Sequence, residues 1–423
     1  MMETSSCDIA IIGGGIIGAS CALALADTGQ QVVLIEPQDL ASGASKGNAG
    51  ALAFADILPL ASPRIIRQAL RWLADPLGPL SLAPSYLLPV APWLLQLWRA
   101  SLPDRYPANI RAQVALMQLA QTEMDALLEN AGLQSHLHTQ GVLEVYEGAH
   151  RLQAAQGTAQ WRDRYGIEAQ VLQGADLAAR QPGLAPRFTH GVYIPGWRNV
   201  GDPQALGQAI GQCAQSRGVQ HLRQSVRWLQ PSGQGVRLIL EDGRLLQAGQ
   251  VVVAAGAHSR QLAQGVGDRI PLDTERGYNT TLPPDALDLR QQITFSDHGF
   301  VVSPLRCGIR VGGAVELAGL KRAPNYQRAQ AMLNKAKAFL PDLDTRDGTP
   351  WMGFRPSLPD SLPIIARSPR HPAVVYAFGH GHLGLTQSAA TARLVRDIIT
   401  QNTPAIDLHP YRVQRFSLWG KRT

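Results

Sequence analysis

Three glycines near the start of the chain have the spacing of a turn that holds the phosphates of a nucleotide. Gly13, Gly15 and Gly18 follow the apolar segment 8–12, which we predict to be a short buried strand. The first glycine permits a tight turn, the second lets the backbone approach a pyrophosphate, and the third lets the following helix touch the strand. The start of that helix would carry the pyrophosphate, because a helix N-terminus is partially positive.

An acidic residue follows this turn at the distance that a dinucleotide-binding unit requires. The apolar segment 31–35 predicts a second strand, and it ends in Glu36. Its carboxylate can accept hydrogen bonds from both ribose hydroxyls of an adenosine. Strand, glycine spacing and acid together predict a βαβ dinucleotide site, although the motif does not distinguish NAD from FAD.

Two later segments could extend this site along a long cofactor. Residues 41–52, "ASGASKGNAGAL", are small and polar, so they form either a loop that offers N–H groups and hydroxyls or an ordinary surface loop. Residues 250–259, "QVVVAAGAHS", predict a buried strand that runs into Ala255 and Gly256. This strand lies too far along the chain to belong to the first βαβ unit, so we expect a discontinuous nucleotide domain with another domain inserted.

The C-terminal region predicts a strand, a glycine-rich turn and a helix. Residues 373–379 are apolar, "GHGHLG" follows, and residues 385–399 carry small side chains at helical spacing. A helix start pointed at a ligand stabilises negative charge there. The alternative is an ordinary crossover between two elements.

One cation in the segment 351–366 lies among aromatic, proline and aliphatic residues. Arg355 has Trp351, Met352 and Phe354 as close neighbours in sequence. A guanidinium stays charged at any working pH, so it cannot stay unpaired in an apolar place. It therefore either lies on the surface or faces a negative group, and the residue types alone leave both possibilities open.

The composition sets the broad class of protein. The chain has 423 residues, of which 45% are hydrophobic and 17% charged, so one large or two ordinary domains can form a sizeable core. The net charge of +7 is not gathered in a basic run, which argues against a nucleic-acid partner and agrees better with anionic lipid or substrate. The four cysteines have no paired or metal-binding spacing, so we expect reduced thiols and no metal. The first residues lack the basic region of a signal peptide, which favours a cytoplasmic protein.

A proline-rich apolar stretch precedes a predicted helix at 108–131. Residues 76–98 carry no charge, but their repeated prolines exclude a continuous membrane-spanning helix. Residues 64–74 are amphipathic, and with the nearby tryptophans they could enter a bilayer interface. The stretch could equally be a lid or a subdomain core over the active site, and the two interpretations are compatible.

Taken together, these segments resemble the DAO family of FAD-dependent D-amino-acid dehydrogenases and glycine–sarcosine oxidases. The chain looks most similar to the bacterial D-amino-acid dehydrogenases. The matching pieces run in family order almost end to end; the first is shared with many flavoproteins, and the last two are more specific. They are IIGGGIIGAS with Glu36, ASGASKGNAGAL, GDPQAL, VVVAAGAHS, ERGYN, RVGGAVE, GFRPSLPDSLPII and FGHGHLGLTQSAATARLV.

The resemblance implies a fold and its domains. We expect an α/β protein, α+β overall, with a discontinuous Rossmann-like FAD-binding domain and an inserted substrate domain with a mixed or antiparallel sheet. Within the inserted region, Asp202 and Pro203 predict a helix start, and Cys307 is expected as a free thiol at a hairpin turn. The expected FAD-binding segments are 1–52, part of 141–260 and 345–423; an apolar helical lid or membrane-facing segment is 53–140; the substrate domain is 261–344 with parts of 141–200.

The resemblance also implies non-covalent FAD and the residues that hold it. Asn48 is expected to bond the flavin or the substrate, Ser42 and Ser45 to meet phosphate or ribitol, and the backbone of Val226 to bond the adenine. The turn at 381–384 would lie against the flavin pyrimidine ring, where the helix start stabilises the reduced flavin. The full set of expected cofactor contacts is Gly13, Gly15, Ile16, Ile17, Gly18, Glu36, Pro37, Ser42, Ser45, Lys46, Gly47, Asn48, Ala49, Gly50, Val226, Ala255, Gly256, Gly353, Gly381, His382, Leu383, Gly384 and Thr386.

The resemblance also indicates which residues hold the substrate, Arg355 of the segment GFRPSLPDSLPII first among them. By resemblance, Arg355 pairs with the substrate carboxylate above the flavin, where its planar fork can bind both oxygens. The alternative is a structural arginine that caps a loop carbonyl. Tyr278 is a second candidate for the carboxylate, or a core tyrosine. His380 would line the pocket or touch the cofactor, and we assign no general base.

The implied activity is FAD-dependent oxidation of D-amino acids, with cyclic and secondary ones such as D-proline derivatives among the candidates. Hydride would leave Cα for flavin N5, and electrons would pass to a quinone or another acceptor. The protein would be cytoplasmic, with a peripheral contact to the inner membrane through residues 64–98. The alternatives are an amine oxidase of sarcosine or glycine type that produces peroxide, a flavin-dependent tRNA-modifying protein, and a non-catalytic flavoprotein.

Overall fold

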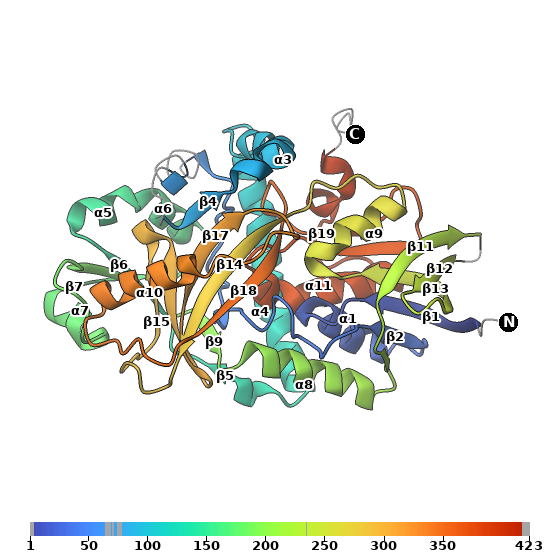
Figure 1. Cartoon of the computed structure of the whole chain (residues 1–423), viewed down its shortest axis with the longest axis horizontal. Coiled ribbons are helices and arrows are strands. Elements are labelled where there is room, and N and C mark those ends of the chain that lie inside the picture. The colour runs from blue at the N-terminus through green and yellow to red at the C-terminus, as the bar shows by residue number, and fades with distance from the viewer. Residues whose placement is uncertain (1–3, 64–68, 70–71, 74–77, 234, 417–423) are drawn as a thin grey trace.

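The computed structural model describes residues 4–63, 69, 72–73, 78–233 and 235–416. Two halves lie side by side, each built around its own sheet, with the long helix α4 (Tyr106–Asn130) near their junction (Figure 1). The predicted amphipathic segment 64–74 falls mostly outside the described residues.

The first half contains the parallel sheet that the glycine motif predicts. Strands β10, β2, β1, β13 and β20 pair in parallel, and β11, β12 and β19 add antiparallel pairs, which makes eight strands in the described part of the chain. The bounds are β1 (Thr4–Ile12), β2 (Val32–Ile35), β10 (Gln220–Leu222), β11 (Val226–Ser232), β12 (Gly235–Leu240), β13 (Leu245–Val253), β19 (Ile364–Arg367) and β20 (Val374–Phe378).

Both faces of this sheet are buried, because side chains alternate along its strands. Ile9 and Ile11 face a core shared with four helices, while Ala10 and Ile12 face a core shared with the β11–β12 ribbon and α9 (Ser259–Gly265). The four helices are α1 (Ile16–Ala26), α4, α8 (Pro203–Ser216) and α11 (Gly384–Ile399). The expected assignment of 53–140 as one lid is therefore wrong for α4, which packs against α11 in this core.

The second half is a larger, mostly antiparallel sheet. Its order is β18-β14-β17-β16-β15-β6-β8-β7 with β4 beside β17, nine strands among the described residues, and β6–β15 and β4–β17 are parallel pairs. Helix α10 (Gln327–Phe339) packs on one face (Figure 1). The bounds are β4 (Leu80–Leu82), β6 (Val142–Tyr146), β7 (Gln170–Gln173), β8 (His190–Ile194), β14 (Asp273–Leu282), β15 (Gln292–Phe295), β16 (Phe300–Leu305), β17 (Gly308–Leu317) and β18 (Thr349–Ser357).

The pairing within this sheet changes one predicted domain boundary. Strand β18 pairs along its whole length with β14, so residues 349–357 belong to the second sheet and not to the FAD-binding segment expected from 345 onward. A small third sheet of β3 (Ala51–Leu52), β9 (Arg198–Val200) and β5 (Leu137–His138) connects the two halves. The remaining helices are α5 (Ala149–Ala154), α6 (Gln156–Arg164) and α7 (Gly174–Arg180).

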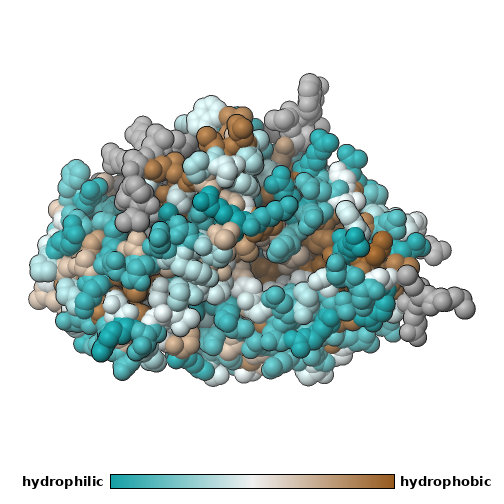
Figure 2. All heavy atoms as spheres, in the orientation of Figure 1, coloured by the Kyte–Doolittle hydropathy of each residue, from teal (hydrophilic) through white to brown (hydrophobic). Residues whose placement is uncertain are grey.

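Helix α3 (Leu87–Ala100) covers the second sheet with one face and exposes the other. Val90 and Trp93 are buried against Leu317, whereas Leu88 and Leu95 are 85% and 63% exposed. Figure 2 shows hydrophobic residues gathered on the surface over this helix. Among the described residues, no helix is both long and apolar enough to span a bilayer.

Two local predictions in the inserted region are confirmed. The Asp202 carboxylate accepts hydrogen bonds from the N–H groups of Gln204 and Ala205 at 2.9 and 3.0 Å, and Pro203 begins α8. Cys307 is an exposed free thiol between β16 and β17.

Candidate active site

A single large cavity runs along the junction of the two halves. Its volume is about 1850 Å³, and it extends from the glycine turn at Gly13 to Arg355 on β18 and Asp56 in the segment after β3. Pockets for drug-sized ligands usually measure roughly 300–1,000 Å³. The cavity therefore has room for a ligand as long as a dinucleotide together with a small substrate.

The glycine turn at one end is packed so tightly that side chains cannot enter it. Gly13 has φ +105°, and a Cβ there would lie 2.5 Å from the Ala254 carbonyl oxygen. A Cβ on Gly18 would lie 1.8 Å from the Gly13 carbonyl oxygen. The turn thus brings the start of α1 directly against β1 and β13, and Gly15, Ile16 and Ile17 line the cavity at this point.

Side chains from two neighbouring segments complete this end. Glu36 accepts hydrogen bonds from the N–H groups of Gly14 at 2.8 Å and Gln38 at 3.0 Å, which fixes its carboxylate at the end of β2. Ser45 accepts one from the N–H of Ile16 at 3.0 Å, so its hydroxyl lies at the first turn of α1 where a phosphate would bind. Ser42 donates to the Gln38 side chain at 3.2 Å.

The small-residue loop 41–50 is fixed by the second sheet. Arg310 on β17 donates to the carbonyl oxygens of Lys46 at 2.9 Å and Asn48 at 2.5 Å. The Asn279 side chain donates to the carbonyl of Gly47 at 3.0 Å, and its own oxygen is buried without a partner while the residue lines the cavity. Asn48 accepts a bond from the N–H of Gly50 at 2.8 Å, which closes the loop.

A second helix start also faces the cavity. No side chain caps the N-terminus of α11, and Gly384, Leu385 and Thr386 line the cavity there. Because the first N–H groups of a helix have no partner within it, this end offers donors and partial positive charge to a ligand. Gly381, with φ +55°, turns the chain into it and donates its N–H to the Pro356 carbonyl at 2.8 Å.

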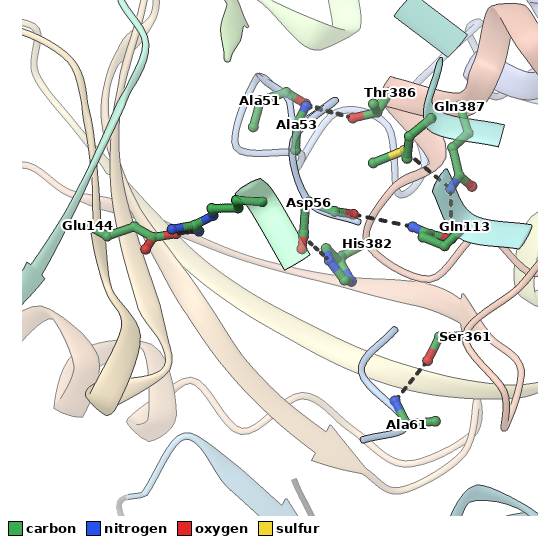
Figure 3. Close-up of polar contacts among 12 residues, drawn as sticks. Ala51, Ala53, Asp56, Ala61, Gln113, Glu144, Ser361, His382, Thr386 and Gln387 are labelled. Atoms are coloured by element: carbon green, nitrogen blue, oxygen red, sulfur yellow. Dashed lines mark hydrogen bonds and ion pairs between the residues drawn. The ribbon is translucent and has the colours of Figure 1, made fainter. Parts of the chain in front are cut away.

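The side chains of Thr386 and His382 hold the segment 51–56 across this helix start (Figure 3). Thr386 accepts a hydrogen bond from the N–H of Ala53 at 3.0 Å and donates to the Ala51 carbonyl at 3.2 Å. His382 Nε2 lies 3.2 Å from the Asp56 carboxylate. Since these side chains are engaged with the segment, contacts of Thr386 and His382 with a cofactor would come from their backbones.

His380 lines the cavity, as expected, but its ring is buried and bonded to α11. Its ring is 3% exposed, and Nε2 lies 2.9 Å from the Thr391 hydroxyl in α11. Burial lowers the pKa of His380 to about 3, so the ring is neutral at neutral pH. It holds the glycine-rich turn on α11, which is a positioning role.

Arg355 lies half-buried in the cavity, with its guanidinium over the backbone of β14. A Cβ on Gly277 would lie 2.7 Å from Cζ and from one terminal nitrogen of Arg355, so the missing side chain of Gly277 leaves the space that the guanidinium occupies. Within the described part of the chain, no hydrogen bond or ion pair engages this side chain. Burial lowers the pKa of Arg355 from its ordinary value, and nearby Glu275 opposes that shift. The expected structural role, capping a loop carbonyl, has no counterpart in these contacts.

Tyr278 does not bring its hydroxyl to Arg355, contrary to the expectation that it helps to hold the carboxylate. The hydroxyl donates to Glu316 at 2.6 Å and accepts from the N–H of Asn325 at 3.0 Å. Tyr278 shares its face of β14 with Arg276, which is fully buried and bonds the carbonyls of Gly319 and Arg322. Both side chains are structural parts of the second sheet.

Most of the residues predicted to contact a cofactor do line the cavity. Three of them do not: Gly18 closes α1 onto β1, Lys46 has an exposed side chain, and Gly50 packs against β9. The cavity-lining ones are Gly13, Gly15, Ile16, Ile17, Glu36, Pro37, Ser42, Ser45, Gly47, Asn48, Ala49, Val226, Ala255, Gly256, Gly353, Gly381, His382, Leu383, Gly384 and Thr386. Two helix starts, a fixed acid and an unpaired buried acceptor along one continuous cavity fit the extended FAD molecule.

Several residues that shape the cavity were not predicted. Arg310 holds the loop, Gly277 makes room for Arg355, and the ring of Trp351 lies so close to Gly47 and Gly353 that a Cβ on either would collide with it at about 2 Å. A glycine inside a strand indicates close approach of another group, and this signal was present at 277.

Comparison with known proteins supports the predicted family. A family model described as "FAD dependent oxidoreductase", the DAO family, matches residues 8–398. The chain is 34% identical over 420 residues to a D-amino-acid oxidase of Bradyrhizobium diazoefficiens, an alignment that covers 96% of this chain and 98% of that protein. It is 27% identical over 416 residues to D-amino acid dehydrogenase 1 of Mesorhizobium japonicum, covering 96% and 99% of the two chains.

Solved structures with the same fold are also found. Glycine oxidase from Geobacillus kaustophilus superposes with a TM-score of 0.74 at 23% identity, covering 97% of this chain and 99% of that one. At this identity the likeness shows the fold alone. It confirms the predicted combination of a Rossmann-like FAD-binding domain and a substrate domain.

Proposed function

The chain belongs to the DAO family of FAD-dependent oxidoreductases, and from this premise we propose that it oxidises free D-amino acids at the Cα–N bond. Bound FAD would supply the two-electron acceptor. The glycine turn, Glu36, Ser45 and the start of α11 would bind the FAD. The relatives named D-amino-acid oxidase and dehydrogenase support the choice of substrate.

The position of Arg355 carries this proposal. It is a half-buried guanidinium without a hydrogen-bonding partner in the described structure, and it lies in the same cavity as the expected flavin contacts. A planar cation in such a place binds a carboxylate through two parallel bonds and so fixes both its position and its rotation. The remainder of the substrate is then held in one orientation.

An anaerobic reduction experiment tests the proposal. The yellow protein is mixed without oxygen with D-amino acids, their L-enantiomers and N-methyl amino acids, and the flavin absorbance is followed. We expect D-amino acids to bleach the flavin. Reduction by sarcosine or glycine alone would favour the amine-oxidase alternative, and a flavin that no amine reduces would indicate a non-catalytic flavoprotein.

We further propose that the electrons pass to a quinone at the inner membrane. The exposed face of α3 supports the membrane part of this proposal, since Leu88 and Leu95 are seven residues apart on one side of the helix and Trp98, 49% exposed, follows three residues later. Apolar side chains with a tryptophan are typical of a helix that enters a bilayer interface. The protein would then be cytoplasmic and peripherally bound.

Flotation with lipid vesicles tests the membrane contact. Vesicles rich in phosphatidylglycerol should carry the wild-type protein, and Leu88→Glu with Leu95→Glu should abolish this. Val171→Glu is the matched control, because Val171 is 58% exposed on β7 and lies outside the α3 face. Equal flotation of all three proteins would contradict the proposed contact.

The electron acceptor is tested separately. The rate of reduction of a soluble quinone is compared with the rate of peroxide formation in air.

A further inference from the structure

The strand that passes beneath Arg355 also presents a carboxylate to the cavity. Glu275 on β14 is directly opposite Arg355 on β18 in the antiparallel register. Because side chains alternate along a strand, Glu275 shares the cavity face with Gly277, while Arg276 and Tyr278 occupy the other face. Glu275 is half-buried and lines the main cavity.

This carboxylate is not used by the fold. In the described part of the chain, the Glu275 carboxylate makes no hydrogen bond, and its distance from the Arg355 nitrogens exceeds the 4.0 Å limit of an ion pair. Cross-strand neighbours of opposite charge commonly pair with each other. Here the guanidinium instead extends over Gly277, so cation and anion both remain open to the cavity.

A small recess beside Glu275 contains a further free polar group. The recess is lined by Glu275, Ser357 and the turn at 379–383. Ser357 is 4% exposed, and its hydroxyl is buried without a hydrogen-bond partner. The carboxylate and the hydroxyl can accept hydrogen bonds from a positive group, and the neighbouring guanidinium can bind a negative one. The site therefore suits a ligand that has positive and negative groups close together.

We propose that Glu275 binds the ammonium group of the substrate while Arg355 binds its carboxylate, so that the site recognises the zwitterion of an α-amino acid. This inference rests on the proposed function and deepens it. It assigns the selection of amino acids over 2-hydroxy acids and simple carboxylic acids to one residue. A carboxylate ligand without an amine would be attracted by the Arg355 guanidinium and repelled by the Glu275 carboxylate.

The other charged groups near Glu275 do not supply this function. His380 is bonded to Thr391, and His382 is bonded to Asp56. Asp273, two residues earlier on β14, accepts the hydroxyl of Tyr86 at 3.0 Å. Glu275 is thus the carboxylate left free opposite Arg355 among the described residues of these elements.

Substitution by an uncharged residue of the same shape tests the proposal, because it predicts effects of opposite sign on two ligands. For Glu275→Gln, the concentration of D-alanine or D-phenylalanine that half-saturates anaerobic flavin reduction should rise roughly tenfold to hundredfold, the usual worth of a charge-assisted hydrogen bond. Propionate and 3-phenylpropionate, the same molecules without the amine, should bind about threefold more tightly or better, since a like charge has been removed. Glu275→Asp should recover part of the amino-acid affinity.

Matched variants separate this role from a structural one. Glu129→Gln changes an exposed carboxylate on α4 and should leave the affinity for both ligands unchanged. Arg355→Met should weaken the binding of both. FAD content and melting temperature are measured for each protein. If Glu275→Gln weakens both ligand types alike, or changes neither, the inference is wrong even though the flavin is still reduced. If the wild-type flavin is reduced by no D-amino acid, the proposed function itself fails.

Discussion

Gly277→Ala should disturb the proposed substrate clamp, the Arg355 guanidinium over Gly277, while leaving the fold intact. Gly277 lies opposite Gly353 in the β14–β18 ladder, and its φ lies outside the left-handed range, so the backbone accepts alanine. The new Cβ would lie 2.7 Å from Cζ and 2.9 Å from Nε of Arg355, whereas ordinary contact begins near 3.4 Å. The guanidinium must therefore move, and because it is the free end of a flexible side chain it can do so cheaply.

The expected cost to activity follows from that displacement. The contact is about 0.7 Å shorter than ordinary contact, so the guanidinium must shift by about that distance. A misplacement of about 1 Å in a reacting group can cost roughly 10²-fold in rate, so we expect kcat/KM to fall roughly 30- to 100-fold. Arg355→Met, which strands the substrate carboxylate, should cost about 3–5 kcal/mol. That equals roughly two to three and a half decades in kcat/KM, so the glycine variant should be the milder of the two.

The assay is anaerobic flavin reduction by a D-amino acid, together with FAD content and thermal unfolding. Gly265→Ala is the control, because a Cβ at Gly265 meets Trp228 only at an ordinary 3.6 Å. If Gly277 acts only through Arg355, adding Gly277→Ala to Arg355→Met should cause no further loss. The reasoning is refuted if folded, FAD-loaded Gly277→Ala keeps wild-type kcat/KM. It is also refuted if the losses in kcat/KM of the two single variants add fully in the double variant.

Two more predictions concern the cofactor loop and acid stability. Arg310→Met removes both bonds to the carbonyls of Lys46 and Asn48, and should weaken FAD binding roughly tenfold or more in a fluorescence titration; unchanged affinity would show that the loop needs no anchor. Since the folded-state pKa of His380 is depressed to about 3 from 6.5, its neutral ring contributes stability that is present above pH 6.5 and is lost as the pH falls toward 3. Between pH 7 and pH 5 this amounts to about 2 kcal/mol in the free energy of unfolding. In chemical denaturation, His380→Asn should therefore lose less stability over that interval than the wild type; a parallel loss would assign the acid sensitivity to other groups.

The sequence predicts those parts of the site that depend on local spacing. The glycine turn, Glu36 and the turn before α11 each lie within one strand–turn–helix unit, where chain geometry fixes the relation between residues. Arg355 stood out because its charge conflicts with its apolar neighbours in sequence, which left a surface position and a negative partner both possible. The resemblance to the family then selected the negative partner. These predictions require no knowledge of which strands pair.

The unpredicted parts depend on pairing between distant segments. Tyr278 was expected at the carboxylate by resemblance to the family, since a tyrosine hydroxyl can hold such a group. The two-residue period of β14 instead puts it on the face that Glu316 and Arg276 occupy. Only the register with β18 shows that Glu275 and Gly277 belong to the cavity face. The domain boundaries failed for the same reason, since β18 and α4 are assigned by what they pack against.

The contacts of β18 make it a more rigid support for the proposed clamp than a loop would be. Its length is paired with β14. Its C-terminal end contacts the turn before α11 through the N–H of Gly381, which donates to the Pro356 carbonyl at 2.8 Å, and through the Ser357–His380 bridge. The indole of Trp93 from α3 donates to the Ser357 carbonyl at 3.3 Å. Arg355 is thus held by the second sheet, by the turn that begins α11 and by the covering helix at once. A hydride donor must keep its Cα at a fixed distance from the acceptor ring, and a cation on a strand that contacts both halves of the molecule is suited to that requirement.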